Sequence, residues 1–271
     1  MLKMMTFNIR GAVNADGPNV WPQRASLNVQ TIKEADPAII GFQEVQAGNL
    51  EVYQQQIPEY ACECGPSANA EEPHQYNSIF WKPEVVKKVR SGSFWLSETP
   101  EVLSGSWETA CIRTATWIHF QMQASGVEFI HLNTHLDHIS AHARLAGSAL
   151  IIQKLQSITH DGILPVLVTG DFNCDPDSPP HRLWLQHDFI DSYRATGHED
   201  NMQANTFHAF NWDKPSSSGK TRGDDILRMD WILVRDPAQK IRPVTCEIVR
   251  TARPPVYPSD HYPVVAQLAG L

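Results

Sequence analysis

Six short polar motifs, each at the end of an apolar, strand-like run, constrain the fold of this 271-residue chain more than any other feature. Asn, Glu, Asp and His are unfavourable inside an apolar strand, but they become useful where several strand ends meet. The motifs extend from residue 6 to residue 261, so both halves of the chain must contribute to one place. We therefore predict a single domain over residues 1–271. The motifs are Thr6-Phe7-Asn8, Gln43-Glu44, Asn133-Thr134-His135-Leu136-Asp137-His138, Gly170-Asp171-Phe172-Asn173, Arg228-Met229-Asp230-Trp231 and Ser259-Asp260-His261.

The composition is that of a globular protein with an acidic balance. Hydrophobic residues make up 42% of the chain and charged residues 19%, which is enough apolar material for a sizeable core. The 22 Lys and Arg residues against 30 Asp and Glu residues give a formal net charge of −8. Proteins that bind nucleic acid tightly usually carry a basic stripe, and this chain has no run rich in Lys or Arg. A nucleic-acid substrate is therefore an alternative that the charge does not favour.

The chain shows no targeting or membrane signal. Its first residues, Met-Leu-Lys-Met-Met, lead straight into the first expected strand, without an apolar stretch that ends in a small-residue cleavage site. No uninterrupted apolar run is long enough to cross a membrane. We therefore expect a cytoplasmic protein without a membrane span. The five cysteines have irregular spacing, which predicts reduced and mostly buried thiols rather than a disulfide framework or a zinc site.

Apolar periodicity predicts strands and helices in mixed order. The clearest helix covers residues 141–158, and its predicted apolar face consists of Leu145, Ala149, Ile152 and Leu155.

Residues 78–81 and 85–89 predict a β-hairpin around Lys82-Pro83. The remaining elements are expected as strands over 2–9, 37–42, 110–123, 126–136, 165–169, 230–234, 244–249 and 262–268, helices from residue 21 and over 50–57, and long loops over 60–75, 97–109 and 197–225.

The six motifs, in this order and at this spacing, resemble those of the endonuclease/exonuclease/phosphatase superfamily. This superfamily includes pancreatic-type deoxyribonuclease, abasic-site endonucleases, neutral sphingomyelinase, inositol polyphosphate 5-phosphatases and poly(A)-shortening nucleases. The resemblance covers nearly the whole chain. It implies an α/β (α+β) fold, a four-layer sandwich in which two mainly antiparallel β-sheets face each other and are flanked by helices.

The resemblance also implies a metal site. Asn8 and Glu44 match the cation ligands of the family, and Asp260 matches a further ligand or a nearby acid. Oxygen donors of this kind suit Mg²⁺, with Mn²⁺ as an alternative, better than zinc.

The catalytic roles follow in the same way. Asp171 matches the acid that orients or deprotonates the attacking water, and Asn173 matches a donor to the phosphoryl oxygens or to the nucleophile. His261 matches the invariant imidazole of the family, Asp230 the carboxylate that orients it, and His135 a second imidazole. These residue types suit the reaction, since phosphate ester hydrolysis needs an aligned water and neutralisation of the phosphoryl charge.

Three further residues are candidates for substrate binding. Arg113 would contact substrate or phosphate, or else pair with a carboxylate. Asn77 resembles a family position near the phosphate. His208, with Trp107 and Trp212, would form an apolar wall within the long loops. His138 is interpreted as a surface residue.

These observations predict a Mg²⁺-dependent phosphoesterase that hydrolyses a small phosphodiester or phosphomonoester by in-line attack of water. The alternative within the same superfamily is a nuclease that cleaves DNA or RNA. An inactive binding module is disfavoured because no catalytic position is visibly substituted. No protein partner can be inferred from the sequence.

Overall fold

Two six-stranded β-sheets form the centre of the molecule, whose computed structural model describes residues 1–159, 162–210 and 228–271. Among the described strands, neighbours run antiparallel except for β1–β2 and β7–β8, which are parallel. The first sheet has the order β11 (Arg242–Ile248), β12 (Val264–Ala269), β1 (Leu2–Asn8), β2 (Ile39–Gln43), β4 (Ile79–Trp81) and β3 (Ala61–Glu63). The second sheet has the order β5 (Val86–Trp95), β6 (Thr114–Met122), β7 (Glu128–His135), β8 (Val166–Asp171), β10 (Asp230–Arg235) and β9 (Ile190–Asp191).

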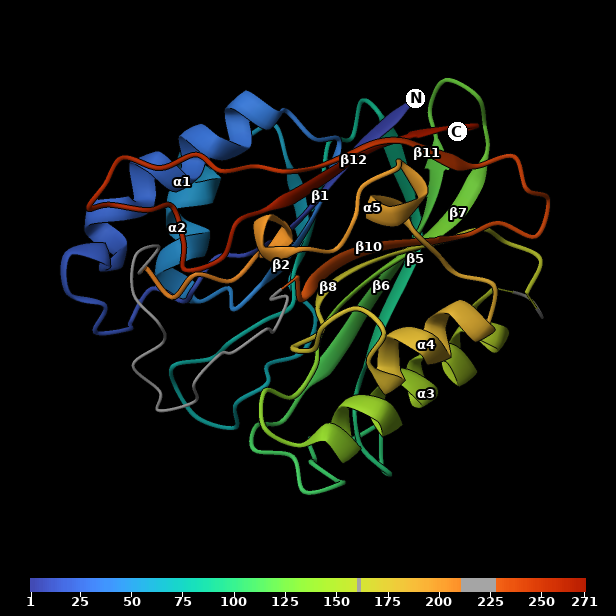
Figure 1. The fold of residues 1–271 in the computed structure, drawn as a ribbon, viewed down its shortest axis with the longest axis horizontal. Helices are drawn as coiled ribbons and strands as arrows, with labels where there is room; N and C mark the ends of the chain where they lie inside the picture. Colours follow the sequence, from blue (N-terminus) through green and yellow to red (C-terminus); the bar gives the residue numbers. More distant parts are fainter. Residues whose placement is uncertain (160–161, 211–227) are drawn as a thin grey trace.

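Helices cover the outer face of each sheet, which produces the four-layer sandwich implied by the resemblance (Figure 1). Helices α1 (Trp21–Ala35) and α2 (Ala47–Gln56) pack on the first sheet. Helices α3 (Ala141–Ile158) and α4 (Pro179–Gln186) pack on the second. The shorter elements are α5 (Ser192–Ala195) and the 3-10 turns η1 (Gly17–Asn19) and η2 (Met202–Ala204). No helix in the described part of the chain is both long and apolar enough to span a membrane.

The apolar run at the start of the chain is explained by burial on both faces. Leu2 and Met4 of β1 face the second sheet, where they join the core between the sheets. Met5 and Phe7 face the opposite way and pack under the helices. A strand covered on both sides has no polar face, so its sequence reads as a continuous apolar segment.

A layer of buried polar side chains joins the two sheets close to their shared edge. The Asn133 amide donates to the backbone oxygens of Phe42 (2.7 Å) and Ser78 (3.0 Å) on the first sheet. Its Oδ1 accepts from Gln43 (2.7 Å) and from Thr169 (3.1 Å). Because these groups are fully buried, their hydrogen bonds fix how the sheets face each other.

The predicted hairpin over residues 78–89 is wrong. Strand β4 pairs with β2 and β3 in the first sheet, whereas β5 pairs with β6 in the second. The turn at Lys82-Pro83 therefore carries the chain from one sheet to the other. When two consecutive strands have a similar apolar pattern, the sequence does not show whether they pair with each other or with other strands.

The predicted apolar face of α3 is also partly wrong, although the helix has the expected bounds. Leu145 is 38% exposed, whereas Ala143 and Gly147 are buried with Ile151 and Leu155. A Cβ on Gly147 would lie 3.3 Å from the Leu96 side chain, so the helix approaches the sheet closely through its small residues. Ala149 of the predicted face is exposed, so the apolar pattern alone did not identify the small residues that face the sheet.

The expected burial of the thiols and two of the expected loops also differ from the structure or extend beyond its described residues. The thiols are not mostly buried, since Cys62 and Cys111 are exposed and only Cys246 of the five is buried. The loop expected over 60–75 contains the short strand β3. The loop expected over 197–225 lies partly outside the described residues, and so does Trp212.

Candidate active site

Strand pairing brings the polar motifs together at one edge of the sandwich. In the second sheet, Asp171 at the end of β8 pairs with His135 at the end of β7 and with Asp230 at the start of β10. In the first sheet, Asn8 at the end of β1 pairs with Gln43 at the end of β2, directly before Glu44. The gathering of these side chains is therefore a direct result of strand register.

The Gly-Asp-Phe-Asn motif shows how the local sequence produces this geometry. A Cβ on Gly170 would lie 2.7 Å from the backbone oxygen of Thr134, so the close approach of β7 and β8 requires glycine. Phe172 is fully buried and stacks on Trp231 with a centroid distance of 4.3 Å. Asn173 then adopts a left-handed backbone (φ 50°), which turns the chain away from the strand.

Asp171 lies at the centre of the site and touches residues from both sheets. Its Oδ2 accepts a hydrogen bond from Asn8 Nδ2 (2.9 Å) and lies 3.3 Å from His135 Nε2 and 3.7 Å from His261 Nε2. Its Oδ1 accepts from the backbone NH of Asn173 (2.9 Å). Burial, followed by the neighbouring charge of Asp230, raises the pKa of Asp171 well above its usual range.

His261 and Asp230 form a tightly bonded pair beside Asp171. His261 Nδ1 lies 2.8 Å from Asp230 Oδ2, and both side chains are almost fully buried. Burial disfavours the charged imidazole, but the carboxylates of Asp230 and Asp171 outweigh this and raise the pKa of His261 to about 10. His261 is therefore a cation near neutral pH, and its Nδ1–H donates to Asp230.

His135 differs from His261 although both face Asp171. Burial, and then the positive charges of Arg113 and His261, hold the pKa of His135 well below its usual value. The site thus places one cationic and one neutral imidazole next to the same carboxylate.

The residues predicted to bind a metal form a second group on the first-sheet side. Asn8 Nδ2 donates to Glu44 Oε1 at 3.1 Å, and the backbone NH of Gly11 lies 3.4 Å from Glu44 Oε2. Glu44 has a left-handed backbone (φ 65°), a conformation that is uncommon for residues other than glycine. Burial and the charge of Glu44 raise the pKa of Asp260, whose Oδ2 lies 3.8 Å from Arg10 Nε.

The donor chemistry of this group fits a hard divalent cation. Glu44 accepts rather long hydrogen bonds, which leaves its oxygens weakly engaged, and Asp260 is a buried carboxylate close to it. One buried carboxylate, one half-buried carboxylate and an amide are donors that Mg²⁺ and Mn²⁺ prefer. Asp171, Asp230 and His261 also have ligand atoms within 4.8 Å of one another. An imidazolium cannot act as a ligand, so the group of Asn8, Glu44 and Asp260 suits a cation better.

The other predicted site residues are buried, except for Asn173, which is half-buried. The Asn77 amide donates to the backbone oxygen (3.0 Å) and the side-chain oxygen (2.9 Å) of Thr114. The Asn173 amide donates to the backbone oxygen of Leu136 (2.9 Å). These amide groups hold the loops of the site in place, and contact with a phosphoryl group remains a prediction for both residues.

Arg113 is 7% exposed, and its Nη2 lies 3.3 Å from His138 Nδ1. His208 is 5% exposed and packs against the rings of Tyr257 and Tyr262, and burial lowers its pKa to about 3. Substrate binding by Arg113 and His208 therefore also stays a prediction.

Two further residues of the site had not been singled out from the sequence. Arg10 follows the first motif and is the cation next to Asp260. Ser259 donates from its hydroxyl to the backbone oxygen of Asn8 (2.7 Å), which ties the last motif to the first. The position of each residue inside or beside a motif was the available signal.

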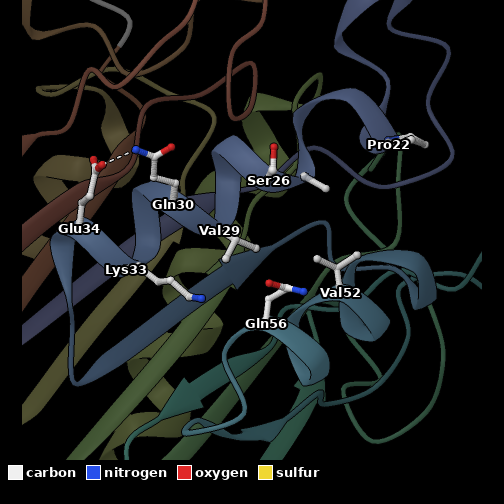
Figure 2. A pocket seen from close by; sticks show the side chains of 9 residues that line it. Pro22, Ser26, Val29, Gln30, Lys33, Glu34, Val52 and Gln56 are labelled. Atoms are coloured by element: carbon white, nitrogen blue, oxygen red, sulfur yellow. Dashed lines mark hydrogen bonds between the residues drawn. The ribbon is translucent and has the colours of Figure 1, made fainter.

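A separate groove lies between α1 and α2 on the outside of the molecule (Figure 2). Its lining includes Ser26, Val29, Lys33, Val52 and Gln56, and none of the strand-end residues described above contributes to it.

Known proteins resemble this chain over most of its length. An endonuclease/exonuclease/phosphatase from Bacteroides vulgatus is 29% identical, with a TM-score of 0.85 over 100% of this chain and 99% of the other. A mannosyl-6-phosphatase from Bacteroides thetaiotaomicron is 26% identical, with a TM-score of 0.84 over 99% of this chain and 100% of the other. The probable RNA exonuclease NGL3 of Saccharomyces cerevisiae is 25% identical over 201 residues, which are 66% of this chain but 39% of the yeast protein.

A model of the Endonuclease/Exonuclease/phosphatase family matches residues 5–261, a range that includes every motif at the strand ends. Together with the two facing sheets and the site between their ends, this match shows that the chain belongs to the endonuclease/exonuclease/phosphatase family.

Proposed function

We propose that the protein hydrolyses a small phosphate ester by metal-assisted, in-line attack of water. Members of the family are hydrolases that act on phosphate esters. The observation that carries the proposal is the pairing register that places His135, Asp171 and Asp230 side by side, with His261 bonded to Asp230.

Asp171 is the group that holds the attacking water. Its raised pKa makes the carboxylate a better proton acceptor than an exposed aspartate, and Asn8 and Asn173 fix its orientation. As the water attacks phosphorus, its proton passes to an Asp171 oxygen, while the bond from phosphorus to the leaving oxygen breaks.

The two imidazoles serve the phosphoryl group. His261 is kept cationic by Asp230, so its Nε2–H can donate to a phosphoryl oxygen as negative charge increases there. His135 stays neutral and can donate one hydrogen bond without adding charge.

Asn8, Glu44 and Asp260 would hold Mg²⁺ or Mn²⁺. When bound, the cation supplies Lewis-acid stabilisation of the phosphoryl and leaving oxygens. Arg10 lies beside Asp260 and partly offsets the negative charge of this ligand set.

The test is a panel of phosphomonoesters, phosphodiesters and oligonucleotides assayed with Mg²⁺. Wild-type protein should hydrolyse at least one small ester, and Asp171→Asn should lower kcat on the order of 100-fold or more because it removes the proton acceptor. Circular dichroism should show that the variant is folded. Equal turnover by wild type and Asp171→Asn would refute the assignment.

A nuclease is the second candidate function. Similarity to the yeast protein named as a probable RNA exonuclease supports it, whereas the net charge of −8 opposes it. A nuclease should cleave oligonucleotides with a steep loss of rate as salt increases, because phosphate contacts release counterions. Faster turnover of a small ester, with little dependence on salt, would favour the first function.

A further inference from the structure

Arg113 is a buried cation that has no carboxylate partner in the part of the chain that the structure describes. The side chain is 7% exposed, and its Nε is buried without a hydrogen-bond partner among the described residues. Within residues 1–159, 162–210 and 228–271, no ion pair includes Arg113. A buried charge is costly unless it is paired, so this guanidinium calls for an anion that binds from outside.

The contact between Arg113 and His138 creates a pair of hydrogen-bond donors. A guanidinium can only donate, so His138 Nδ1 must accept the hydrogen bond from Arg113 Nη2 at 3.3 Å. The remaining proton of neutral His138 is then on Nε2. Burial and the charge of Arg113 lower the pKa of His138, which favours this neutral form. The pair therefore offers N–H groups and no acceptor.

The pair lies next to the reacting centre. Arg113 is the strongest charged influence on the pKa of His135, which itself lies 3.3 Å from Asp171. The negative charge of Glu44, one of the proposed cation ligands, also acts on His138 and opposes the lowering of its pKa. Strand pairing agrees with this, because Ala115, two residues after Arg113, pairs with Thr134, the residue before His135. Arg113 and His138 therefore lie beside the strand end that carries His135.

We propose that Arg113 and His138 bind the terminal oxygens of a phosphomonoester dianion, and that they select monoesters over diesters. This inference rests on the proposed phosphoesterase function. A terminal phosphate presents three non-bridging oxygens, and a guanidinium fork can engage two of them at once. A diester has only two such oxygens and one negative charge. It would therefore neutralise the buried guanidinium of Arg113 less well than a monoester dianion does.

The experiment compares kcat/KM for p-nitrophenyl phosphate and bis(p-nitrophenyl) phosphate in Mg²⁺. Arg113→Gln should lower kcat/KM for the monoester on the order of 100-fold, and kcat/KM for the diester by less than about 5-fold. Arg113→Lys should recover only part of the loss, because an ammonium lacks the fork. His138→Ala, at an exposed position, should lower the monoester value about 10-fold without loss of folding.

Arg253→Gln is the matched control. Arg253 is exposed and contacts Gln30 on α1, so its replacement makes the same charge change away from the site and should leave both values unchanged. Thermal unfolding of each variant shows whether an activity loss comes from the fold.

The two esters separate the possible outcomes. Equal losses for both esters in Arg113→Gln, or no loss for either, would overturn the monoester subsite. Failure of the proposed function would appear differently, as an absence of turnover by wild type on both esters. In that case calorimetric titration with inorganic phosphate decides: the subsite predicts binding that Arg113→Gln weakens at least 10-fold, and unchanged or undetectable binding refutes it.

Discussion

At the scale of single residues, Asp137 shows how one carboxylate can organise the surroundings of a site. Its Oδ2 accepts hydrogen bonds from Thr109 Oγ1 (2.9 Å) and from the backbone NH groups of Ala110 (2.9 Å) and Cys111 (3.1 Å). Its Oδ1 accepts from the NH groups of Ile139 (2.9 Å) and Ser140 (2.6 Å). These bonds hold the pKa of Asp137 at about 2, although burial alone would raise it. Asp137 thus fastens the loop before Arg113 to the start of α3.

Replacement of Asp137 should therefore affect both stability and activity. Asp137→Ala leaves five donors without their acceptor and should lower the free energy of unfolding by about 1–3 kcal/mol, measured by urea denaturation. Activity should also fall at a temperature where the variant is folded, because Arg113 loses its support.

Asp236 provides the comparison, since it accepts from the backbone NH groups of Ala238, Lys240 and Ile241 in a turn remote from the site. Asp236→Ala should lower stability and leave activity unchanged. If Asp137→Ala keeps wild-type activity, the carboxylate does not organise the site.

At the scale of strands and helices, sequence patterns predicted what each element is but not always what it packs against. The bounds of α3 agree with the expectation, and β7 and β8 end within two residues of their expected ends, at His135 and Asp171. The partners of β4 and β5 could not be predicted, because pairing depends on contacts between distant segments. The hydrogen bonds that Asp137 accepts could not be predicted for the same reason, since the donors Ala110 and Cys111 lie in an irregular loop.

The polar layer between the sheets leads to a prediction about acid stability. His131 lies in this layer, with Nε2 2.8 Å from Thr169 Oγ1, and complete burial lowers its pKa from 6.5 to about 3. The folded state therefore resists protonation, while the unfolded chain takes up a proton as the pH falls below 6.5. Stability is fully present above that pH and is lost as the pH falls towards 3.

Urea denaturation at pH 7 and pH 5 measures this contribution. His131 alone should account for a loss of about 2 kcal/mol over that interval. His131→Gln keeps an N–H group for Thr169 but cannot be protonated. Between pH 7 and pH 5 its free energy of unfolding should therefore fall by about 2 kcal/mol less than that of wild type. An identical pH dependence for both proteins would show that His131 does not titrate as described.

At the scale of the whole molecule, the site exists because two sheets end at the same edge. Asn8 and Glu44 come from the first sheet and its connections, and His135, Asp171 and Asp230 come from the second. The order of the motifs was enough to identify the family, and the family match over residues 5–261 agrees with it. The Arg113–His138 pair was not predicted, because only the folded chain shows that this buried arginine has a histidine rather than a carboxylate beside it.

The central claim is that residues from both sheets build one divalent cation site next to Asp171. A crystal of the protein soaked in Mn²⁺ and measured for anomalous scattering tests it most directly, because manganese occupies the same kind of oxygen site as magnesium and can be located independently of activity. We expect one strong anomalous peak about 2.1 Å from oxygens of Glu44 and Asn8 and close to Asp260. A peak held by Asp171, Asp230 and His261 alone, or no peak within the site, would contradict it.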